Sequence, residues 1–297
     1  MFALVRDLAN GREVTEIPVS LWFVERHHLG PLAARAGLVA AKDELVHSTV
    51  AWARTERVLP PIVDRLVSAG VRVAPLKGVS YATSIYAIPA ERPMSDIDLL
   101  VEPHDVAERV LAELGYTSTP SSPFHHATTW SLRDTWLDLH RGFVSAGRST
   151  VELERVWERT SAGWPRGARR LERTDELIFH FVHMARGRLC GPLVQIVDAH
   201  RLLADGDGEL FARADRWKLG KSVRIAHAYY RSIMDGHVVQ PYATEEDLIY
   251  VRQPSFAKRV RFDLAVSESP RQLAARAVDW IAQRWFAGRP SGDARGR

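Results

Sequence analysis

Two aspartates interrupt an apolar stretch in the first third of the chain. Asp96 and Asp98 stand two residues apart in Ser95-Asp-Ile-Asp-Leu-Leu-Val101, whose Ile and Leu residues are typical of a buried strand. Alternate side chains of a strand emerge on one face, so we expect the two carboxylates to lie side by side rather than in a solvated loop. Like charges repel at that distance unless a cation lies between them. The pattern therefore predicts a site for Mg²⁺ or Mn²⁺, which favour oxygen ligands.

A third carboxylate has a similar setting. Asp138 lies between two leucines in Trp136-Leu-Asp-Leu-His140, where Trp136 and His140 share its face if the segment is a strand. Three aspartates that converge at one edge of a sheet are able to hold two metal ions around a phosphoryl group. Cys190 is the single cysteine, which excludes an intramolecular disulfide framework and a zinc site built on several thiolates. Its apolar surroundings are typical of a packing residue rather than a nucleophile.

The segment before these aspartates suits phosphate binding. In Leu76-Lys-Gly-Val-Ser80 a predicted strand meets a predicted helix through a glycine. Free backbone N–H groups at such a helix start attract anions, and Lys77 and Ser80 stand beside them. The pattern GxxxxGK[ST] is absent, so the segment is not a P-loop.

The elements that position these residues follow from local patterns. We expect a helix that ends at Pro60-Pro61 and a second helix that ends at Gly70. Further elements are then expected in this order: a strand over 71–76, a turn at Lys77-Gly78, a helix over 79–87, a strand over 95–101, a helix over 104–114, and a hairpin of strands 124–132 and 135–143.

The remainder of the chain is mainly helical in pattern. Helices are expected over 177–184, 193–203 and 271–286, and the last ten residues lack core formers. This predicts four regions: a helical N-terminal region (1–69), an α/β core (70–150), a helical C-terminal domain (151–287) and a disordered tail (288–297).

Composition sets outer limits on the function. The 297 residues are 46% hydrophobic and 26% charged, with a net charge of only +4, which does not by itself indicate a nucleic-acid partner. No apolar run approaches the ~20 residues of a membrane-spanning helix. Arg6 and Asp7 break the apolar N-terminus, unlike a secretory signal, so we expect a cytoplasmic protein.

Four pieces of sequence occur in order along the chain: Leu76-Lys-Gly78, Tyr86, Arg92-Pro-Met-Ser-Asp-Ile-Asp-Leu-Leu-Val101 and Asp138-Leu-His140. Together they resemble the uncharacterised bacterial nucleotidyltransferase family of the DNA polymerase β superfamily, over most of the chain. The resemblance implies an α+β fold, with a small mixed-sheet core of the polymerase β type between N-terminal and C-terminal helical regions. One departure is that Val79 follows Gly78, whereas many members of the superfamily have serine or glycine there.

The resemblance also implies an activity. The enzyme would transfer a nucleoside monophosphate from an NTP to an acceptor and release pyrophosphate, with Mg²⁺ or Mn²⁺ as cofactor. Asp96, Asp98 and Asp138 would be the catalytic metal ligands. The residues expected to bind the NTP are Lys77, Gly78, Ser80, Arg92 and His140. The sequence leaves the acceptor open among small molecules, sugars, peptides, proteins and tRNA.

Two other functions remain open from the residues alone. A glycosyltransferase also uses Asp-x-Asp, to hold Mn²⁺ against a sugar nucleotide, but the Lys-Gly segment and the third carboxylate disfavour it. An inactive nucleotide-binding protein is disfavoured because all three carboxylates are present.

Several other polar and aromatic residues have weaker patterns. His180, His183 and Asp198 would suit a metal site, but a buried polar cluster or part of an acceptor pocket is favoured. The pairs His27-His28 and His125-His126 are expected in loops or at the surface. Trp130 and Trp136 are candidates for stacking on a nucleobase.

Overall fold

The computed structural model describes residues 2–17, 19–119, 125–145, 147–204, 206–236, 242, 245–252 and 254–287. They divide into two compact units, each built from separate stretches of chain. Unit 1 comprises Met1–Glu56, Lys77–Met94 and Glu172–Glu268, and unit 2 comprises Arg57–Leu76, Ser95–Leu171 and Ser269–Arg297. The predicted tail, 288–297, and Phe124 of the predicted hairpin lie outside the described residues.

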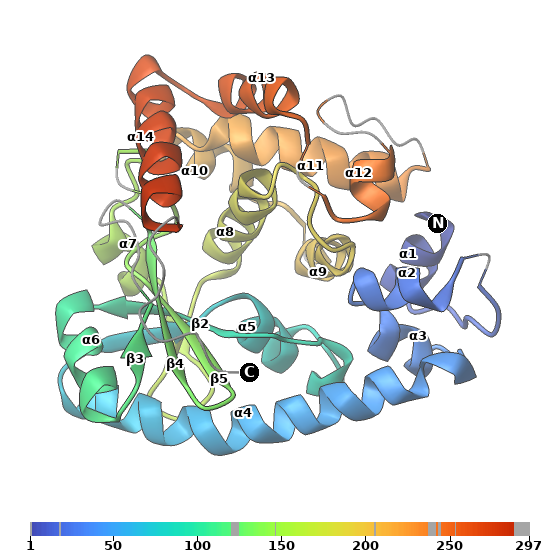
Figure 1. The fold of residues 1–297 in the computed structure, drawn as a ribbon, viewed down its shortest axis with the longest axis horizontal. Coiled ribbons are helices and arrows are strands. Elements are labelled where there is room, and N and C mark those ends of the chain that lie inside the picture. Colours follow the sequence, from blue (N-terminus) through green and yellow to red (C-terminus); the bar gives the residue numbers. More distant parts are fainter. Residues whose placement is uncertain are drawn as a thin grey trace. The chain divides into compact units, whose positions relative to one another are not determined.

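Unit 2 contains a five-stranded mixed sheet, which confirms the predicted α+β class (Figure 1). Its strands are β1 (Arg72–Pro75), β2 (Ile97–Glu102), β3 (Thr117–Ser118), β4 (Ala127–Leu132) and β5 (Thr135–His140), in the order β1-β2-β5-β4-β3. The β2–β5 pair is parallel and the other pairs are antiparallel. A crossover between β2 and β5 therefore places two segments that are distant in sequence next to each other.

Apolar side chains hold the central pair in place. Leu99, Leu100, Leu137 and Leu139 are fully buried, so β2 and β5 have apolar neighbours on both faces of the sheet. Arg133 and Asp134 form the two-residue connection from β4 to β5, and Arg133 takes a left-handed φ of +52°. The predicted hairpin is thus confirmed over the described residues.

The predicted break at Pro60-Pro61 is wrong. Helix α4 runs unbroken from Lys42 to Ser68 with both prolines inside it (Figure 1). Because proline has no N–H, the carbonyls of Glu56 and Arg57 lack their helical hydrogen-bond donors. Both residues are exposed, so water can donate to these carbonyls instead. Three fully buried side chains of the same stretch, Leu59, Val63 and Leu66, contribute about 1.5–3 kcal/mol each. Together they offset the roughly 3 kcal/mol that each interior proline costs.

Helices and a short ribbon complete unit 2. They are the second half of α4, α6 (His104–Glu113), α7 (Leu153–Glu158), α14 (Pro270–Ala287) and the pair β6 (Ser161–Ala162) and β7 (Arg169–Arg170). Helix α14 contacts the loop that follows β5. Ser145 donates to Asp279 at 2.9 Å, the Gln272 amide donates to the Arg148 carbonyl at 2.9 Å, and these side chains are buried.

Unit 1 is helical. Its elements are α1 (Phe2–Ala9), α2 (Leu21–Arg26), α3 (Gly30–Arg35), η1 (Val39–Ala41), the first part of α4, α5 (Lys77–Ser84), η2 (Pro89–Glu91), α8 (Arg173–Arg186), α9 (Val194–Leu202), α10 (Leu210–Arg216), α11 (Gly220–Met234), α12 (Glu245–Ile249) and α13 (Phe256–Val266). Ten residues of α8 are buried, and Phe181 and Phe262 are among the largest fully buried side chains. The helices predicted over 177–184 and 193–203 are confirmed as parts of α8 and α9.

The predicted turn at Lys77-Gly78 is also wrong, because these residues begin helix α5. Lys77 enters the helix with a left-handed φ of +44°. A Cβ at Gly78 would lie 2.6 Å from Cγ of Met94, so glycine allows the methionine side chain to pack against the helix start. The glycine thus serves a close contact rather than a turn.

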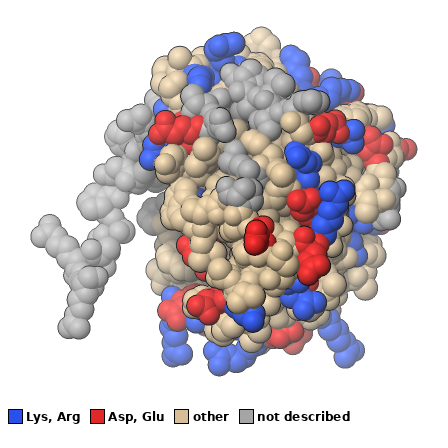
Figure 2. Space-filling model, turned by 90° about the vertical axis from the view of Figure 1, so that its right-hand side faces the viewer, with Lys and Arg blue, Asp and Glu red and all other residues tan. Residues whose placement is uncertain are grey.

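On the face drawn in Figure 2, Lys and Arg side chains are interspersed with Asp and Glu rather than gathered into one basic patch. Among the described residues, no helix has the length and apolar character that crossing a bilayer requires.

His27 lies in the turn that follows α2, as expected of a loop position, but it is buried rather than at the surface. The Leu193 N–H donates to Nδ1 at 3.2 Å, and Nε2 lies 3.1 Å from the Ile249 carbonyl, so Nε2 carries the proton of a neutral ring. Burial lowers the pKa of His27 to about 4. A second proton would have to enter on Nδ1 and would break the hydrogen bond from Leu193.

We therefore expect the fold to weaken in acid. In the unfolded chain His27 has a pKa near 6.5, so between about pH 6.5 and 4 the unfolded chain binds more protons than the folded one. The free energy of unfolding should fall as the pH falls through this window, by up to about 1.4 kcal/mol per pH unit. Urea unfolding at pH 7, 6 and 5 measures it, and His27→Gln should show a shallower slope. An unchanged slope would remove His27 as a cause.

Candidate active site

The register of the central strands brings two carboxylates together. Asp98 of β2 lies directly opposite Asp138 of β5, and His140 follows Asp138 by two residues on the same face. One ligand atom from each of the three side chains lies within 4.8 Å of the others. Two of the three predicted aspartates therefore meet, as the sequence predicts, and the third member of the group is a histidine.

Hydrogen bonds fix the orientation of these side chains. His140 Nε2 lies 2.7 Å from Oδ1 of Asp98, and because an ionised carboxylate only accepts, Nε2–H is the donor. The Thr129 hydroxyl donates to Oδ1 of Asp138 at 2.6 Å. Asp98 and His140 are buried and Asp138 is half-buried, so the group is open to solvent mainly at Asp138.

Thr129 and His126 are neighbours of this group that the sequence analysis missed. Thr129 pairs with Asp138 across the hairpin, a position that follows from counting back from the two-residue turn. His126 is buried rather than exposed, and its ring packs edge-on against His140 with centroids 5.1 Å apart. The Arg141 N–H also donates to the His126 carbonyl at 2.8 Å, which ties the two strand ends together.

The prediction that Asp96 lies within the strand is wrong. Strand β2 begins at Ile97, which pairs with Leu137, so Asp96 comes just before the ladder. Asp96 instead lies in a bend, half-buried, and accepts a hydrogen bond from Ser95 at 2.8 Å. It is not a member of the Asp98–Asp138–His140 group, and its role as a metal ligand stays a prediction.

The donor set of the group suits a divalent cation. Two carboxylates offer hard oxygen ligands on adjacent strands, and the imidazole offers one nitrogen. Their negative charges are close and would be neutralised by the ion. The residues present therefore fit the metal that the sequence predicts.

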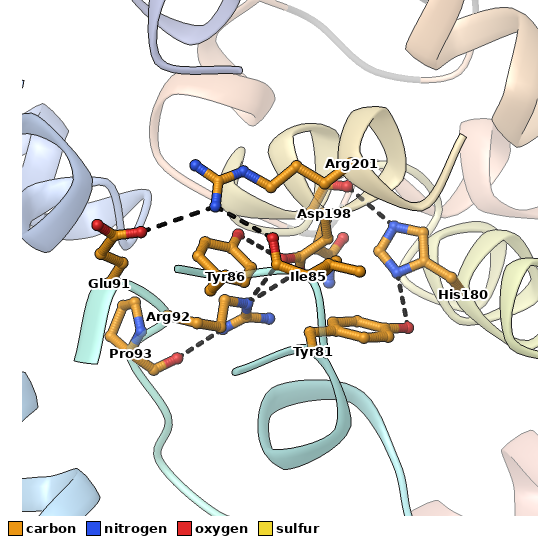
Figure 3. A network of polar contacts seen from close by, with 10 residues as sticks. Tyr81, Ile85, Tyr86, Glu91, Arg92, Pro93, His180, Asp198 and Arg201 are labelled. Atoms are coloured by element: carbon orange, nitrogen blue, oxygen red, sulfur yellow. Dashed lines mark hydrogen bonds and ion pairs between the residues drawn. The ribbon is translucent and has the colours of Figure 1, made fainter. Parts of the chain in front are cut away.

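Four of the five residues predicted to bind the NTP, Lys77, Gly78, Ser80 and Arg92, belong to unit 1, and the fifth, His140, belongs to unit 2. Ser80 is buried and donates a hydrogen bond to Glu176 of α8. Arg92 places Nε 2.9 and 3.0 Å from the two carboxylate oxygens of Asp198, and Tyr86 donates to the same carboxylate at 2.6 Å (Figure 3). Binding of NTP by these residues, by Lys77 and by Gly78 stays a prediction.

Further contacts enclose this ion pair, as Figure 3 shows. The Arg201 guanidinium lies over the Tyr86 ring at 4.1 Å and 3.7 Å from the Glu91 carboxylate. Asp198 has no exposed side-chain surface, and the Arg92 side chain is 11% exposed. The ion pair is thus buried. Burial by itself lowers the pKa of Arg92, but the Asp198 carboxylate and the neighbouring tyrosines outweigh it and raise the pKa overall, so the guanidinium remains charged.

His180 belongs to the same buried cluster. Its Nδ1 lies 3.0 Å from the Tyr81 hydroxyl and its Nε2 2.9 Å from the Gln195 carbonyl, which makes Nε2 the donor. Burial lowers the pKa of His180 and keeps the ring neutral. The contacts favour the interpretation as a buried polar cluster over a metal site that includes Asp198, because Arg92 occupies both oxygens of that carboxylate.

The two candidate stacking residues lie in different surroundings. The Trp130 ring is buried, and its Nε1 donates to Thr128 at 3.2 Å. Trp136 is 48% exposed and lies on the face of β5 that Asp138 and His140 share. Only Trp136 therefore remains available to stack on a base.

Comparisons with known proteins give a family and two structural neighbours. A sequence-family model described as an uncharacterised nucleotidyltransferase matches residues 50–235, more than half of the chain. The crystal structure of ANT(2'')-Ia in complex with adenylyl-2''-tobramycin is 14% identical, with a TM-score of 0.39 over 60% of this chain and 98% of that one. The solution structure of the antibiotic-resistance factor ANT(2'')-Ia is 15% identical, with a TM-score of 0.39 over 62% and 95%. No curated protein compared with the chain matches it.

Proposed function

The chain belongs to the uncharacterised nucleotidyltransferase family, and from this premise we propose a metal-dependent reaction that moves a nucleoside monophosphate from an NTP to a hydroxyl acceptor. The observation that carries the proposal is the meeting of Asp98 and Asp138 on adjacent strands, with His140 beside them. The family match favours nucleotidyl transfer over the glycosyltransferase that Asp-x-Asp also suggested.

The two carboxylates would have different roles. Asp98, buried and oriented by His140, would be a fixed metal ligand, and Asp96 is proposed as a further ligand. Asp138 is the more accessible of the pair, so we propose that it also takes the proton of the acceptor hydroxyl. Thr129 would hold one oxygen of Asp138 in place. Mg²⁺ or Mn²⁺, when bound, would neutralise the triphosphate charge and polarise the α-phosphate.

The reaction balances as an in-line displacement. The acceptor oxygen forms a bond to the α-phosphorus, and the bond from that phosphorus to the bridging oxygen of the β-phosphate breaks. Pyrophosphate leaves with the electron pair, and the acceptor proton passes to Asp138. Positioning and neutralisation of charge supply most of the catalysis in such a transfer.

Isotope labelling tests the proposed function directly. The purified chain is incubated with each of the four α-labelled NTPs, Mg²⁺ or Mn²⁺, and a small-molecule cell extract. We expect a labelled product heavier than its acceptor by one nucleoside monophosphate, with Asp138→Asn suppressing its formation. Transfer of γ-label indicates a kinase, and a hexose adduct from sugar nucleotides indicates a glycosyltransferase. Either result would overturn the proposal.

Lys77 provides a narrower test of NTP binding. It begins α5, separated by one residue from the end of β1 at Pro75, and we propose that its ammonium group contacts the triphosphate. Lys77→Ala should then weaken NTP binding by about 1–3 kcal/mol, the cost of losing a charge-assisted hydrogen bond. Calorimetry with NTP and Ca²⁺ measures this, and Lys42→Ala removes an equal charge at an exposed position as the control. Equal NTP affinity in both variants would exclude Lys77 from the binding site.

A further inference from the structure

The group that the proposed function relies on contains a nitrogen donor. His140 lies on the same strand face as Asp138, and its Nε2 points at Oδ1 of Asp98. We propose that His140 is itself a metal ligand through Nε2, so that the site is a mixed oxygen and nitrogen site that prefers Mn²⁺ to Mg²⁺. The inference rests on the proposed function only in that both place a divalent cation at Asp98 and Asp138.

The separation of the donor atoms suits this arrangement. Two ligands that each lie about 2.1 Å from one ion, at right angles to each other, are about 3 Å apart. His140 Nε2 and Asp98 Oδ1 are 2.7 Å apart, so a shift of a few tenths of an ångström opens the space for a shared ion. Asp138 lies opposite Asp98 in the register and offers the third ligand atom of the group.

The surroundings hold the imidazole in this position. His140 is 1% exposed, and the edge-on His126 ring packs against it. The strand itself continues the β4–β5 ladder as far as His140, which pairs with Ala127. The ring is therefore fixed toward the carboxylates, and ligation needs no large movement of the side chain.

Ligation does require a change of tautomer. Nε2 carries the proton that is donated to Asp98, and a ligating nitrogen must present a lone pair. The proton leaves Nε2 and one is taken up on Nδ1, so the ring remains neutral and no net charge changes. The hydrogen bond from Nε2 to Oδ1 of Asp98 is then replaced by ligation of the same ion by both atoms.

The nitrogen ligand determines the preference among cations. Imidazole suits the later first-row transition metals best; Mn²⁺ stands at the weak end of that series and accepts nitrogen less readily than they do, but more readily than the harder Mg²⁺, whose sites are built from oxygen ligands. We expect His140→Asn, which exchanges the nitrogen ligand for an amide, to weaken Mn²⁺ binding about tenfold or more and to change Mg²⁺ binding much less. The ratio of the two affinities should shrink accordingly.

Affinity alone does not separate a ligand from an orienting residue. Loss of a residue that only hydrogen-bonds to a ligand also costs about 10- to 100-fold in metal affinity. A histidine that merely orients Asp98 would, however, leave the ion surrounded by oxygen only. The decisive observable is thus the nucleus bound to the metal.

Pulsed electron paramagnetic resonance of bound Mn²⁺ measures that nucleus. The full chain, labelled with ¹⁵N in its histidines, is loaded with Mn²⁺ alone, and the spectrum is examined for coupling to ¹⁵N. We expect a coupling in the wild-type protein that disappears in His140→Asn and persists in the control His47→Asn, whose histidine is exposed on α4. The wild-type spectrum needs no substitution, so a folding defect in a variant does not prevent the test.

Each outcome has one meaning. Mn²⁺ that is lost in Asp98→Asn but shows no ¹⁵N coupling in the wild type would overturn the ligand role of His140 and leave the proposed function intact. Coupling that survives His140→Asn would also overturn it. Mn²⁺ that binds equally to wild type and Asp98→Asn would contradict the metal site of the proposed function itself.

Discussion

Asp98→Asn is expected to abolish nucleotidyl transfer, with turnover falling by about 10³-fold or more. Removal of one preorganised group that stabilises transition-state charge lowers turnover by roughly 10²- to 10³-fold. We expect a loss at the upper end of this range or beyond, because Asp98 would hold the cation that neutralises the whole triphosphate. Turnover is measured with the α-labelled NTP that the function assay selects, in saturating Mg²⁺ and then in saturating Mn²⁺.

The fold should tolerate this change, which separates catalysis from stability. The asparagine oxygen can still accept from His140, and one of two facing negative charges is removed. We therefore expect a melting temperature equal to or above that of the wild type. Asp105→Asn is the matched control, because Asp105 is an exposed residue of α6 in the same unit and pairs with Arg109. Near-normal turnover of Asp98→Asn would mean that the metal-ligand assignment is wrong.

Asp198→Ala is expected to have the largest effect on stability. It would leave the buried Arg92 guanidinium without the carboxylate whose two oxygens accept from its Nε. It would also remove the group that accepts the Tyr86 hydroxyl hydrogen bond. Breaking a buried ion pair on one side costs about 3–5 kcal/mol. Urea unfolding followed by circular dichroism measures the loss.

The chain contains a matched control for this experiment. Asp215 also binds an arginine, Arg224, through two hydrogen bonds of 2.6 Å, but half of each side chain is exposed. Asp215→Ala should cost no more than about 1 kcal/mol. Adding Arg92→Met to Asp198→Ala should restore part of the lost stability, because it removes the uncompensated charge. A loss in Asp198→Ala as small as in Asp215→Ala would show that burial does not govern this pair.

Local patterns were sufficient for the elements that carry the candidate site. The alternation around Asp98 and Asp138 predicted both strands, because a carboxylate within a buried apolar run is visible in the sequence itself. The hairpin was also predictable from its two-residue turn. The position of Asp96 was not, since the start of β2 depends on where its partner strand begins to pair, at Leu137.

Contacts between distant residues explain the other differences. Arg92 was predicted to bind phosphate, and nothing near it in sequence indicates its partner Asp198, which is 106 residues away. His126 was expected in a loop or at the surface; it lies in the bend before β4, but it is buried there against His140. Pro60 and Pro61 locally disfavour the interior of a helix, and burial of Leu59, Val63 and Leu66 outweighs that cost.

The discontinuous make-up of unit 2 has a consequence for how the chain is synthesised. A ribosome produces Asp98, Asp138 and His140 long before it reaches α14, yet the loop after β5 depends on that helix for its contacts with Gln272 and Asp279. A nascent chain stopped at Glu268 would hold the whole Asp98–Asp138–His140 group but leave the buried Ser145 and Arg148 without those contacts. Premature termination near the end of the message should therefore yield a product that is degraded, even though its Asp98–Asp138–His140 group is complete.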